Sequence, residues 1–267
     1  MKNRLVKRVH VLFSSALIFF LHLPFVFATV KIDAVIPENS PLGLQPVGTT
    51  VAEKVAPVAF ASHKNIYDSL NLGAIGLRKE VFDCAMRGYD NLRQKGKLEK
   101  DEVISIADLS KSSCKKRLYV LDLKKYKLLF NTYVAHGINS GQEFAKQFSN
   151  APESNKTSLG FYETASTYNG KNGYSLHLVG MEKGINDNAY KRDIVLHGAD
   201  YVNEDLIQAQ GYIGRSQGCP AVPEKQHKKI IDKIKNGTCF FIYAEDRNYL
   251  RRSALLQSTM PPLVAVN

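Results

Sequence analysis

The chain has 267 residues, of which 44% are hydrophobic, and this is ample for one good core or for a small helical part plus one β-rich domain. Its formal net charge is +11, and a basic chain suits acidic surfaces and polymers as partners. The basic residues are scattered in pairs with no nucleic-acid motif beside them, which argues against a nucleic-acid-binding protein.

The first residues, 1–28, have the pattern of a secretory signal peptide. An apolar run begins at Val9 and ends in the small or modest residues 26–28, and it follows the basic residues Lys2, Arg4, Lys7 and Arg8. An uncleaved membrane anchor is the alternative, because about 20 apolar residues can span a bilayer. Pro24 and Ala28 favour cleavage, so we expect an exported protein of the periplasm or cell envelope. Loss of the four basic residues would leave a net charge of +7.

A linker and a helical segment are predicted next. Residues 29–62 contain four prolines, small polar residues and no sustained periodicity, which is typical of a linker. Between 63 and 100 the apolar residues recur at a helical period, and Gly96 is placed to end the helix. We therefore expect a helical lead-in at 63–100, with the apolar stripe Val81, Phe82, Ala85, Tyr89 and Leu92.

Residues 101–246 predict a mainly β body. Short alternating runs rich in β-branched and aromatic residues indicate strands, and Asn-Gly dipeptides at 169–170 and 172–173 indicate a hairpin. The predicted strands cover 103–107, 117–123, 127–135, 161–168, 174–179, 193–197 and 238–244.

Two helices interrupt the later strands. Asn203 is placed to cap a short helix over 204–210, and a longer helix opens at Pro223 with Ile230, Ile231 and Ile234 on its buried edge. The tail at 247–267 is basic and then rich in proline, and predicts no clear structure. The expected architecture is a β-sandwich or open barrel with a small N-terminal helical lead-in.

The strongest signal for chemistry is His197-Gly198 followed by Gly214-Arg215-Ser216-Gln217-Gly218-Cys219-Pro220. A cysteine is a nucleophile only as thiolate, and a neighbouring histidine is the usual group that takes its proton. Gly218 lets the backbone turn, so that its N–H and that of Cys219 can face an oxyanion. A buried apolar or disulfide-bonded cysteine is the alternative, which the polar, glycine-rich flanks of Cys219 disfavour.

These motifs resemble the L,D-transpeptidase (YkuD-type) catalytic domain family, which carries a His-Gly at a strand end and a Ser-x-Gly-Cys loop after a short insertion. The murein L,D-transpeptidase-like branch of that family is the more similar one. The resemblance runs from about Leu77 to Tyr243 and includes residues 148–150, 158–162, 174–176 and 214–223.

The resemblance implies a catalytic domain at 101–246 that needs no cofactor. Cys219 would attack the carbonyl that links a diamino acid to the terminal D-amino acid of a wall tetrapeptide, and His197 would form an ion pair with the thiol or act as general base. The D-amino acid would leave a thioester, which an amine of a neighbouring stem peptide would resolve into a cross-link. Water in place of that amine would give a carboxypeptidase, and an inactive peptidoglycan-binding domain is the third hypothesis. The implied partners are peptidoglycan stem peptides, with the membrane surface or a wall lipoprotein as further ones.

Two positions depart from the family's pattern. Many members have histidine in place of Gln217, so His197 must serve alone, and many have an arginine shortly after the cysteine. Arg215 is the predicted substitute for that cation, and Ser216 with Gly218 would support the oxyanion loop. The other candidates for the substrate groove are His136, Ser149 and Asn150, of which His136 is also interpretable as a satisfied turn residue. A backbone carbonyl beside Gly198 is the expected orienting group for His197.

The remaining cysteines and histidines indicate structural roles. Cys239 lies in an apolar strand and is expected in the core, and His227 lies in a polar helical context and is expected to be solvated. A Cys84–Cys114 disulfide is an open hypothesis in an oxidising compartment. No His or Cys spacing indicates a metal site. Gly214-x-Ser216-x-Gly218 also matches the serine-hydrolase elbow, although the sequence around it predicts a loop and only His227 follows it.

Overall fold

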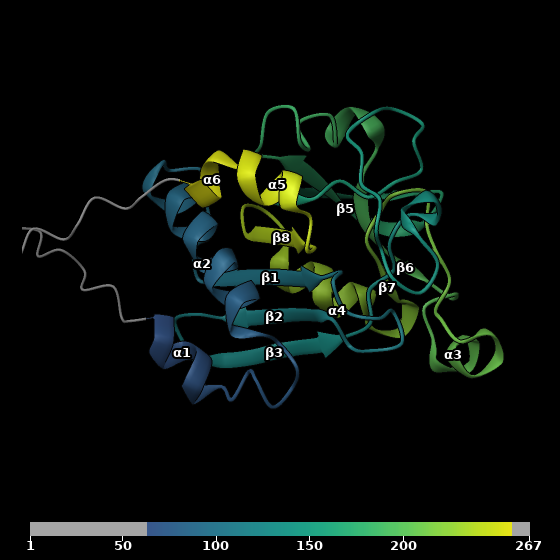
Figure 1. The fold of residues 1–267 in the computed structure, drawn as a ribbon, viewed down its shortest axis with the longest axis horizontal. Coiled ribbons are helices and arrows are strands. Elements are labelled where there is room, and N and C mark those ends of the chain that lie inside the picture. Colours follow the sequence, from purple (N-terminus) through teal and green to yellow (C-terminus); the bar gives the residue numbers. More distant parts are fainter. Residues whose placement is uncertain (1–62, 258–267) are drawn as a thin grey trace, which may run out of the picture. The chain divides into compact units, whose positions relative to one another are not determined.

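The computed structural model describes residues 63–257 and confirms a mainly β fold with helices (Figure 1). One eight-stranded sheet has the order β3-β2-β1-β8-β4-β5-β6-β7. Its strands are β1 (Val103–Asp108), β2 (Leu118–Asp122), β3 (Lys127–Thr132), β4 (Gly160–Gly170), β5 (Gly173–Gly180), β6 (Val195–Ala199), β7 (Ala221–Pro223) and β8 (Cys239–Tyr243). The α-helices are α1 (His63–Ser69), α2 (Lys79–Gln94), α3 (Glu204–Gln210), α4 (Glu224–Ile234), α5 (Arg247–Arg252) and α6 (Ala254–Gln257), and the short 3-10 helices are η1 (Ile138–Ser140) and η2 (Tyr190–Arg192).

Three of the predicted segments fall wholly or partly outside the described residues. The signal peptide at 1–28, the linker at 29–62 and the end of the tail at 258–267 are the parts concerned. Between residues 63 and 257, no helix is both long enough and apolar enough to cross a membrane. The boundaries proposed for lead-in, body and tail stay predictions.

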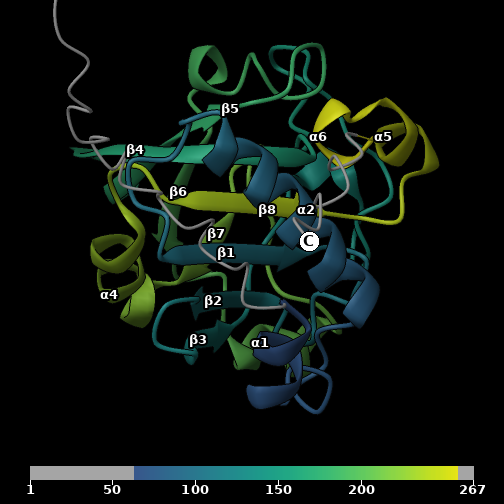
Figure 2. The ribbon, with the colours of Figure 1, turned by 90° about the vertical axis from the view of Figure 1, so that its left-hand side faces the viewer.

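Helix α2 lies across the central strands β1 and β8 (Figure 2). The predicted apolar stripe is buried along this helix, and Gly96 follows it at φ +61, the left-handed conformation expected after a helix end. Gly88 faces the sheet, where a Cβ atom would lie 2.0 Å from Cζ of Phe161. Glycine at position 88 therefore allows the close approach of α2 to β4.

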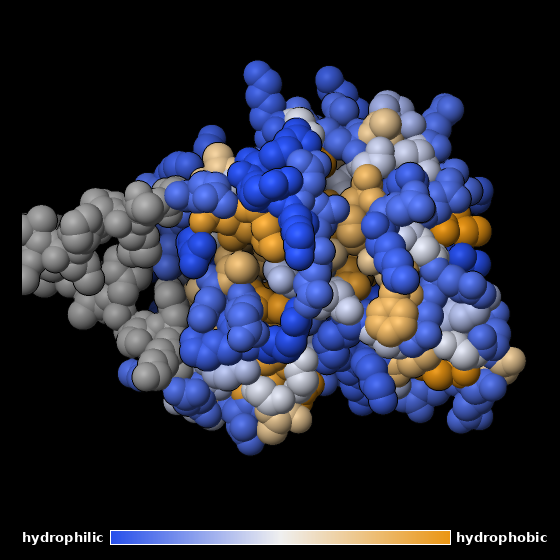
Figure 3. Space-filling view, viewed as in Figure 1, coloured by the Kyte–Doolittle hydropathy of each residue, from blue (hydrophilic) through white to orange (hydrophobic). Residues whose placement is uncertain are grey.

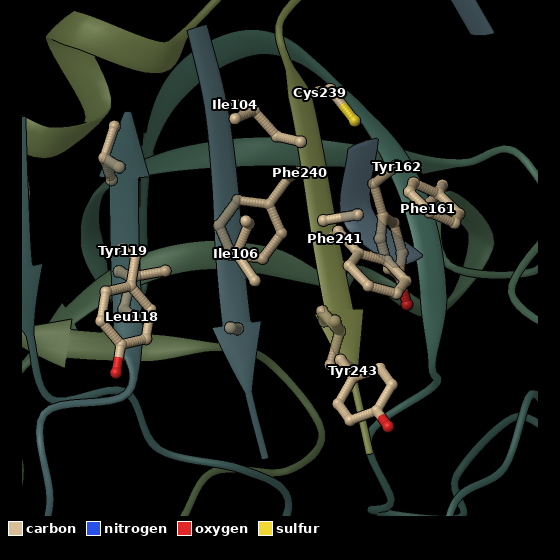
Figure 4. Close-up of a cluster of buried hydrophobic side chains, with 14 of the residues drawn as sticks. Ile104, Ile106, Leu118, Tyr119, Phe161, Tyr162, Cys239, Phe240, Phe241 and Tyr243 are labelled. Atoms are coloured by element: carbon tan, nitrogen blue, oxygen red, sulfur yellow. The ribbon is translucent and has the colours of Figure 1, made fainter. Parts of the chain in front are cut away.

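Strand β8 is the last strand in the chain but lies at the centre of the sheet. It pairs in parallel with β1 and antiparallel with β4, so Phe241 stands opposite both Ile106 and Phe161. The rings of Phe161 and Phe241 stack with their centroids 4.1 Å apart, within the cluster of side chains in Figure 4. All five residues of β8 are buried, including Cys239, which confirms its predicted place in the core.

The chain after β3 joins the two ends of the sheet. Ala135, three residues beyond the end of β3, forms an antiparallel bridge with Ala221 of β7, and its amide donates to the Ala221 carbonyl at 2.7 Å. The sheet is therefore nearly closed, which supports the open-barrel form of the predicted architecture. The face seen in Figure 3 is mostly hydrophilic, with small hydrophobic patches between polar residues.

The expectation of no clear structure beyond residue 246 is wrong for residues 247–257. Helices α5 and α6 form there, and Asp246 caps α5 by accepting from the Tyr249 amide at 2.7 Å. The hydroxyls of Tyr249 and Ser253 both donate to the buried carboxylate of Glu182, in the turn after β5. These helices are too short to show a helical period in the sequence, and Glu182, which holds them, lies 67 residues before Tyr249.

The hypothesis of a Cys84–Cys114 disulfide is not supported, because both cysteines are unpaired. Cys84 lies on α2, whereas Cys114 lies in the turn before β2 with its thiol 2.8 Å from the carbonyl of Gly211. Gly211 ends α3, so Cys114 faces a different part of the fold from the helix that carries Cys84.

Candidate active site

Strands β6 and β7 bring His197 and Cys219 to neighbouring positions. His197 is the third residue of β6 and pairs with Ala221, the first residue of β7. The His197 amide donates to the Pro220 carbonyl at 3.4 Å, directly after Cys219. Strand β7 therefore fixes the thiol loop, residues 216–219, next to the strand that carries His197. We did not predict β7 from the sequence, because it has three residues and ends in proline.

The Cys219 thiol is half-buried against the chain entering β6. Its Sγ lies 3.5 Å from the Val195 amide nitrogen, which donates to sulfur, and 3.5 Å from the Asp193 carbonyl oxygen, which accepts from the thiol. Burial raises the pKa of Cys219 above its ordinary value, although the Val195 amide and the Arg192 guanidinium act in the opposite direction. The resting thiol is therefore protonated at neutral pH.

The His197 imidazole is oriented by a backbone carbonyl. Its Nδ1 lies 2.9 Å from the Gly198 oxygen. A carbonyl can only accept, so Nδ1 carries the proton and Nε2 keeps a free lone pair. This carbonyl is the orienting group that the sequence predicted. Burial lowers the pKa of His197, with the Gly198 carbonyl acting in the opposite direction, so the imidazole is neutral at pH 7.

The protonation states of Cys219 and His197 distinguish between the two mechanisms that the sequence left open. A resting ion pair needs a lowered thiol pKa and a raised imidazole pKa. Burial shifts the pKa of both Cys219 and His197 in the direction that disfavours the charged form. The resting Cys219 and His197 are therefore both uncharged, which disfavours a resting ion pair.

Ser216 holds the turn that carries the thiol. Its hydroxyl accepts from the Gly218 amide at 3.1 Å and donates to the Cys219 carbonyl at 2.6 Å. The Gly218 amide is therefore bonded within the loop and does not face an oxyanion, whereas the Cys219 amide stays the predicted donor. A serine nucleophile at position 216 is disfavoured because this hydroxyl is engaged and strand β7, not a helix, follows the turn.

Thr157 clamps the same turn from a neighbouring loop. Its hydroxyl donates to the Gly218 carbonyl at 3.2 Å and accepts from the Gly137 amide at 2.9 Å. Its own amide donates to Ser140 Oγ at 2.9 Å. The sequence analysis missed Thr157, because nothing in its local context distinguishes it from any other loop threonine.

A family model described as "L,D-transpeptidase catalytic domain" matches residues 74–243. The chain belongs to the L,D-transpeptidase catalytic domain family. No curated protein matches the chain. The family match covers β1 to β8 and contains both His197 and Cys219.

Solved structures similar to this L,D-transpeptidase-family chain share little sequence with it. An L,D-transpeptidase from Mycobacterium smegmatis is 14% identical with a TM-score of 0.34, covering 54% of this chain and 59% of its own. The helical cell shape determining protein Pgp2 from Campylobacter jejuni is 15% identical with a TM-score of 0.36, covering 54% of this chain and 48% of its own. This chain thus spans less than two thirds of the length of those proteins.

Arg215 borders a cavity next to the thiol loop of this L,D-transpeptidase domain. Its Nη1 donates to the Gly141 carbonyl at 3.2 Å, and its guanidinium lies 5.3 Å from the ring centroid of Tyr212. The cavity has a volume of about 330 Å³ and is lined by Ile138, Tyr201, Leu206, Gln210, Tyr212, Gly214 and Arg215. Burial, with a smaller contribution from Cys219, raises the pKa of Tyr201 to about 12, so this phenol stays neutral beside the thiol.

Ser149 and Asn150, the predicted groove residues, hold loops together in the structure. Ser149 Oγ accepts from the Ala151 amide at 3.1 Å. The Asn150 side chain donates to the Asp187 carboxylate at 2.7 Å and accepts from the Asn188 amide at 3.2 Å. Both residues are half-buried, and their contact with substrate stays a prediction.

His136 is only 1% exposed, which favours the interpretation of a satisfied turn residue. Its Nδ1 accepts from Nη2 of the fully buried Arg117 at 2.8 Å, and its Nε2 donates to the Gly141 carbonyl at 3.3 Å. Burial and the Arg117 charge lower the pKa of His136 to about 3. With both ring nitrogens bonded, His136 supports the loop and does not line the groove.

His227 is buried on α4, so the expectation that it is solvated is wrong. Its Nδ1 lies 2.6 Å from the Glu224 carbonyl. A Cβ atom at Gly198 would lie 2.6 Å from the His227 ring, so glycine after His197 makes room for this helix. Among residues 63–257, no group of His, Cys, Asp or Glu side chains is arranged to hold a metal ion.

Proposed function

We propose that this chain is an exported murein L,D-transpeptidase that forms peptidoglycan cross-links through a thioester on Cys219. The observation that carries the proposal is the bond from His197 Nδ1 to the Gly198 carbonyl, at 2.9 Å, in the strand next to the thiol loop. It leaves Nε2 with a free lone pair, which is what a general base requires. Family membership, which implies peptidoglycan peptides as the substrate class, supports the same reaction.

In the first half-reaction Cys219 becomes acylated. The thiol proton passes to Nε2 of His197 while sulfur attacks the carbonyl carbon between the diamino acid and the terminal D-amino acid. The Cys219 amide stabilises the tetrahedral oxyanion. The carbon–nitrogen bond then breaks, His197 returns the proton to the leaving amine, and the D-amino acid departs.

In the second half-reaction an amine of a neighbouring stem peptide attacks the thioester carbonyl. His197 takes a proton from that amine and returns it to the Cys219 sulfur as the carbon–sulfur bond breaks. The products are the cross-linked peptide and the free thiol. Arg215 and the adjoining cavity are the proposed site for a carboxylate of the peptide, because this guanidinium lies directly before the thiol loop.

The signal-peptide pattern of residues 1–28 supports export to the periplasm or cell envelope. The basic charge of the chain suits carboxylate-rich wall peptides, the membrane surface or an acidic wall lipoprotein.

Mass spectrometry of purified disaccharide-tetrapeptide after incubation with the chain tests the proposal, with Cys219→Ala as control. We expect a cross-linked dimer that has lost one terminal D-amino acid, and no product with the variant. Tripeptide without dimer would make the enzyme a carboxypeptidase with the same nucleophile. Binding without product in either sample would favour a wall-binding domain, and full turnover by Cys219→Ala would refute the cysteine mechanism.

A further inference from the structure

Arg192 is the last residue of η2, three residues before β6 begins at Val195. All its terminal N–H groups donate hydrogen bonds. Its Nη1 donates to the Ser149 carbonyl at 2.9 Å and to Ser158 Oγ at 2.6 Å. Its Nη2 donates to Ser154 Oγ at 3.1 Å and to the Lys156 carbonyl at 2.8 Å. The four acceptors are all neutral, so none of these bonds neutralises the charge of the guanidinium.

The same guanidinium borders the thiol loop. A Cβ atom at Gly218 would lie 3.5 Å from Nη2 of Arg192 and 3.0 Å from the Lys156 carbonyl that Nη2 binds. Asp193, the next residue along the chain, supplies the carbonyl that accepts from the Cys219 thiol. Arg192 is thus built into the wall of the site between the loop 149–158 and the nucleophile.

Among the charged and titratable groups around Cys219, Arg192 is the cation that acts on the sulfur. From the same segment, the Asp193 carboxylate disfavours a thiolate, whereas Arg192 and the Val195 amide favour it. Tyr168 of β4 and Tyr201 after β6 are phenols with pKa values raised above their ordinary range, chiefly by burial, so both are neutral at pH 7. His197 of β6 is neutral as well. The half-buried charge of Arg192 is screened by solvent and salt less than a surface charge, so its effect on the sulfur is stronger.

We propose that Arg192 is a positioning residue whose fixed positive charge favours the thiolate of Cys219 and whose bonds hold the loop 149–158 against the nucleophile turn. The charge is needed at the moment of attack, when the thiol has given its proton to His197 and the sulfur is anionic. The inference rests on Cys219 being the nucleophile of the proposed function.

The pH dependence of Cys219 alkylation tests this without requiring turnover. The full chain is treated with iodoacetamide over a range of pH, and the labelled fraction of the Cys219 peptide is measured by mass spectrometry. Peptide mapping separates this signal from Cys84, Cys114 and Cys239. Because an opposite charge nearby lowers a thiol pKa by about 1 unit or more, we expect Arg192→Gln to move the alkylation midpoint up by about 1 unit. Lys191→Gln, which removes the same charge from the exposed neighbouring residue, should leave the midpoint unchanged.

Arg192→Lys separates charge from loop packing. It keeps the cation but cannot make four divergent bonds, so we expect a lower melting temperature with an alkylation midpoint within a few tenths of a unit of the parent chain. If Arg192→Gln does not fold, Arg192→Lys still keeps the proposal falsifiable, because a shifted midpoint with the charge retained would refute it. An unchanged midpoint in Arg192→Gln, or an upward shift of about 1 unit in Arg192→Lys, would overturn the proposal. The alkylation experiment does not depend on the transpeptidase assay. The proposed function and the proposed effect of Arg192 on Cys219 can therefore fail separately.

Discussion

The chain contains two His-Gly dipeptides, one after strand β3 and one within β6, and the hydrogen bonds of the two imidazoles differ. At His136 both ring nitrogens are bonded, Nδ1 to Arg117 and Nε2 to the Gly141 carbonyl. At His197 only Nδ1 has a hydrogen-bond partner among the described residues, the Gly198 carbonyl, and the thiol loop follows the neighbouring strand pairing. A histidine becomes a base when its second nitrogen is left free, and the sequence around it does not show which nitrogen that is.

Two buried or half-buried arginines, Arg117 and Arg192, also differ in what they border. Arg117 is completely buried and donates to the carbonyls of Val134 and Lys111 as well as to His136. Burial lowers the pKa of Arg117 to about 9. Arg192 is only half-buried and stands beside the nucleophile turn. Arg117 therefore serves the fold, whereas Arg192 is placed to serve the chemistry.

The largest expected effect is the loss of transpeptidation when His197 is substituted. His197→Ala removes the proposed general base, and we expect transpeptidation to fall about 10²- to 10⁴-fold, measured as kcat/KM on disaccharide-tetrapeptide. His136→Ala is the matched variant at the other dipeptide, and its turnover per folded molecule should stay within a few-fold of the parent chain. Equal losses in the two variants would contradict the distinction drawn between the two histidines.

Arg117→Met should mainly affect stability. It leaves the buried Val134 carbonyl, the half-buried Lys111 carbonyl and one nitrogen of His136 without the Arg117 donors, and each buried unsatisfied group costs about 1–3 kcal/mol. Removing a buried charge offsets part of this, so we expect a net loss of about 2–4 kcal/mol of unfolding free energy. Urea unfolding measures it, and a loss below about 0.5 kcal/mol would show that the Arg117 bonds contribute little.

The free energy of unfolding should fall as the pH is lowered, because His136 takes up a proton more readily in the unfolded chain. Because burial lowers its pKa from 6.5 to about 3, the unfolded chain takes up a proton between these values that the folded chain does not. The stabilising contribution is therefore complete above pH 6.5 and is lost as the pH falls toward 3. Between pH 6.5 and 4.5 we expect the parent chain to lose about 2–3 kcal/mol more than His136→Gln, measured by urea unfolding at both pH values. Parallel pH profiles of the two proteins would refute this role for His136.

Thr157→Val should give the smallest effect. The hydroxyl of Thr157 links the segment after His136 to the turn before Cys219, since it binds both the Gly137 amide and the Gly218 carbonyl. Valine has nearly the same shape, so we expect a loss of about 1–2 kcal/mol in unfolding free energy and a several-fold fall in turnover. Thr164→Val, at a buried threonine whose hydroxyl bonds Ile234 and Thr238, controls for the loss of a buried hydroxyl, and its turnover should be unchanged.

The sequence predicted the features that neighbouring residues determine. The strands appear within one to three residues of the expected bounds, and Asn203 caps α3 as predicted by accepting from the Leu206 amide at 2.8 Å. Gly170 pairs with Gly173, so the expected hairpin turns over two residues. Local propensity and turn chemistry are sufficient to predict such elements.

What the sequence missed depends on contacts between distant residues. Strand β7 exists because β6 and Ala135 lie on either side of it, and α5 and α6 are held through Glu182. Within the site, the pairing of β6 with β7 places His197 beside the Cys219 loop, and the motifs predicted these residues without predicting how they meet. Thr157 and Arg192 carry no local signal, since only the folded chain brings them against Gly218.

The position of β8 has a consequence for the order in which the chain can acquire its structure. Strands β1 to β3 form one half of the sheet and β4 to β7 the other, and β8 is the link between them. A nascent chain that has not yet produced residues 239–243 therefore has two half-sheets with open inner edges. The edge at β1 is buried throughout in the complete sheet, and unpaired strand edges favour association with other chains. The central strand of the barrel is therefore available only after nearly the whole domain has been synthesised, which makes its pairing a late, non-local step of folding.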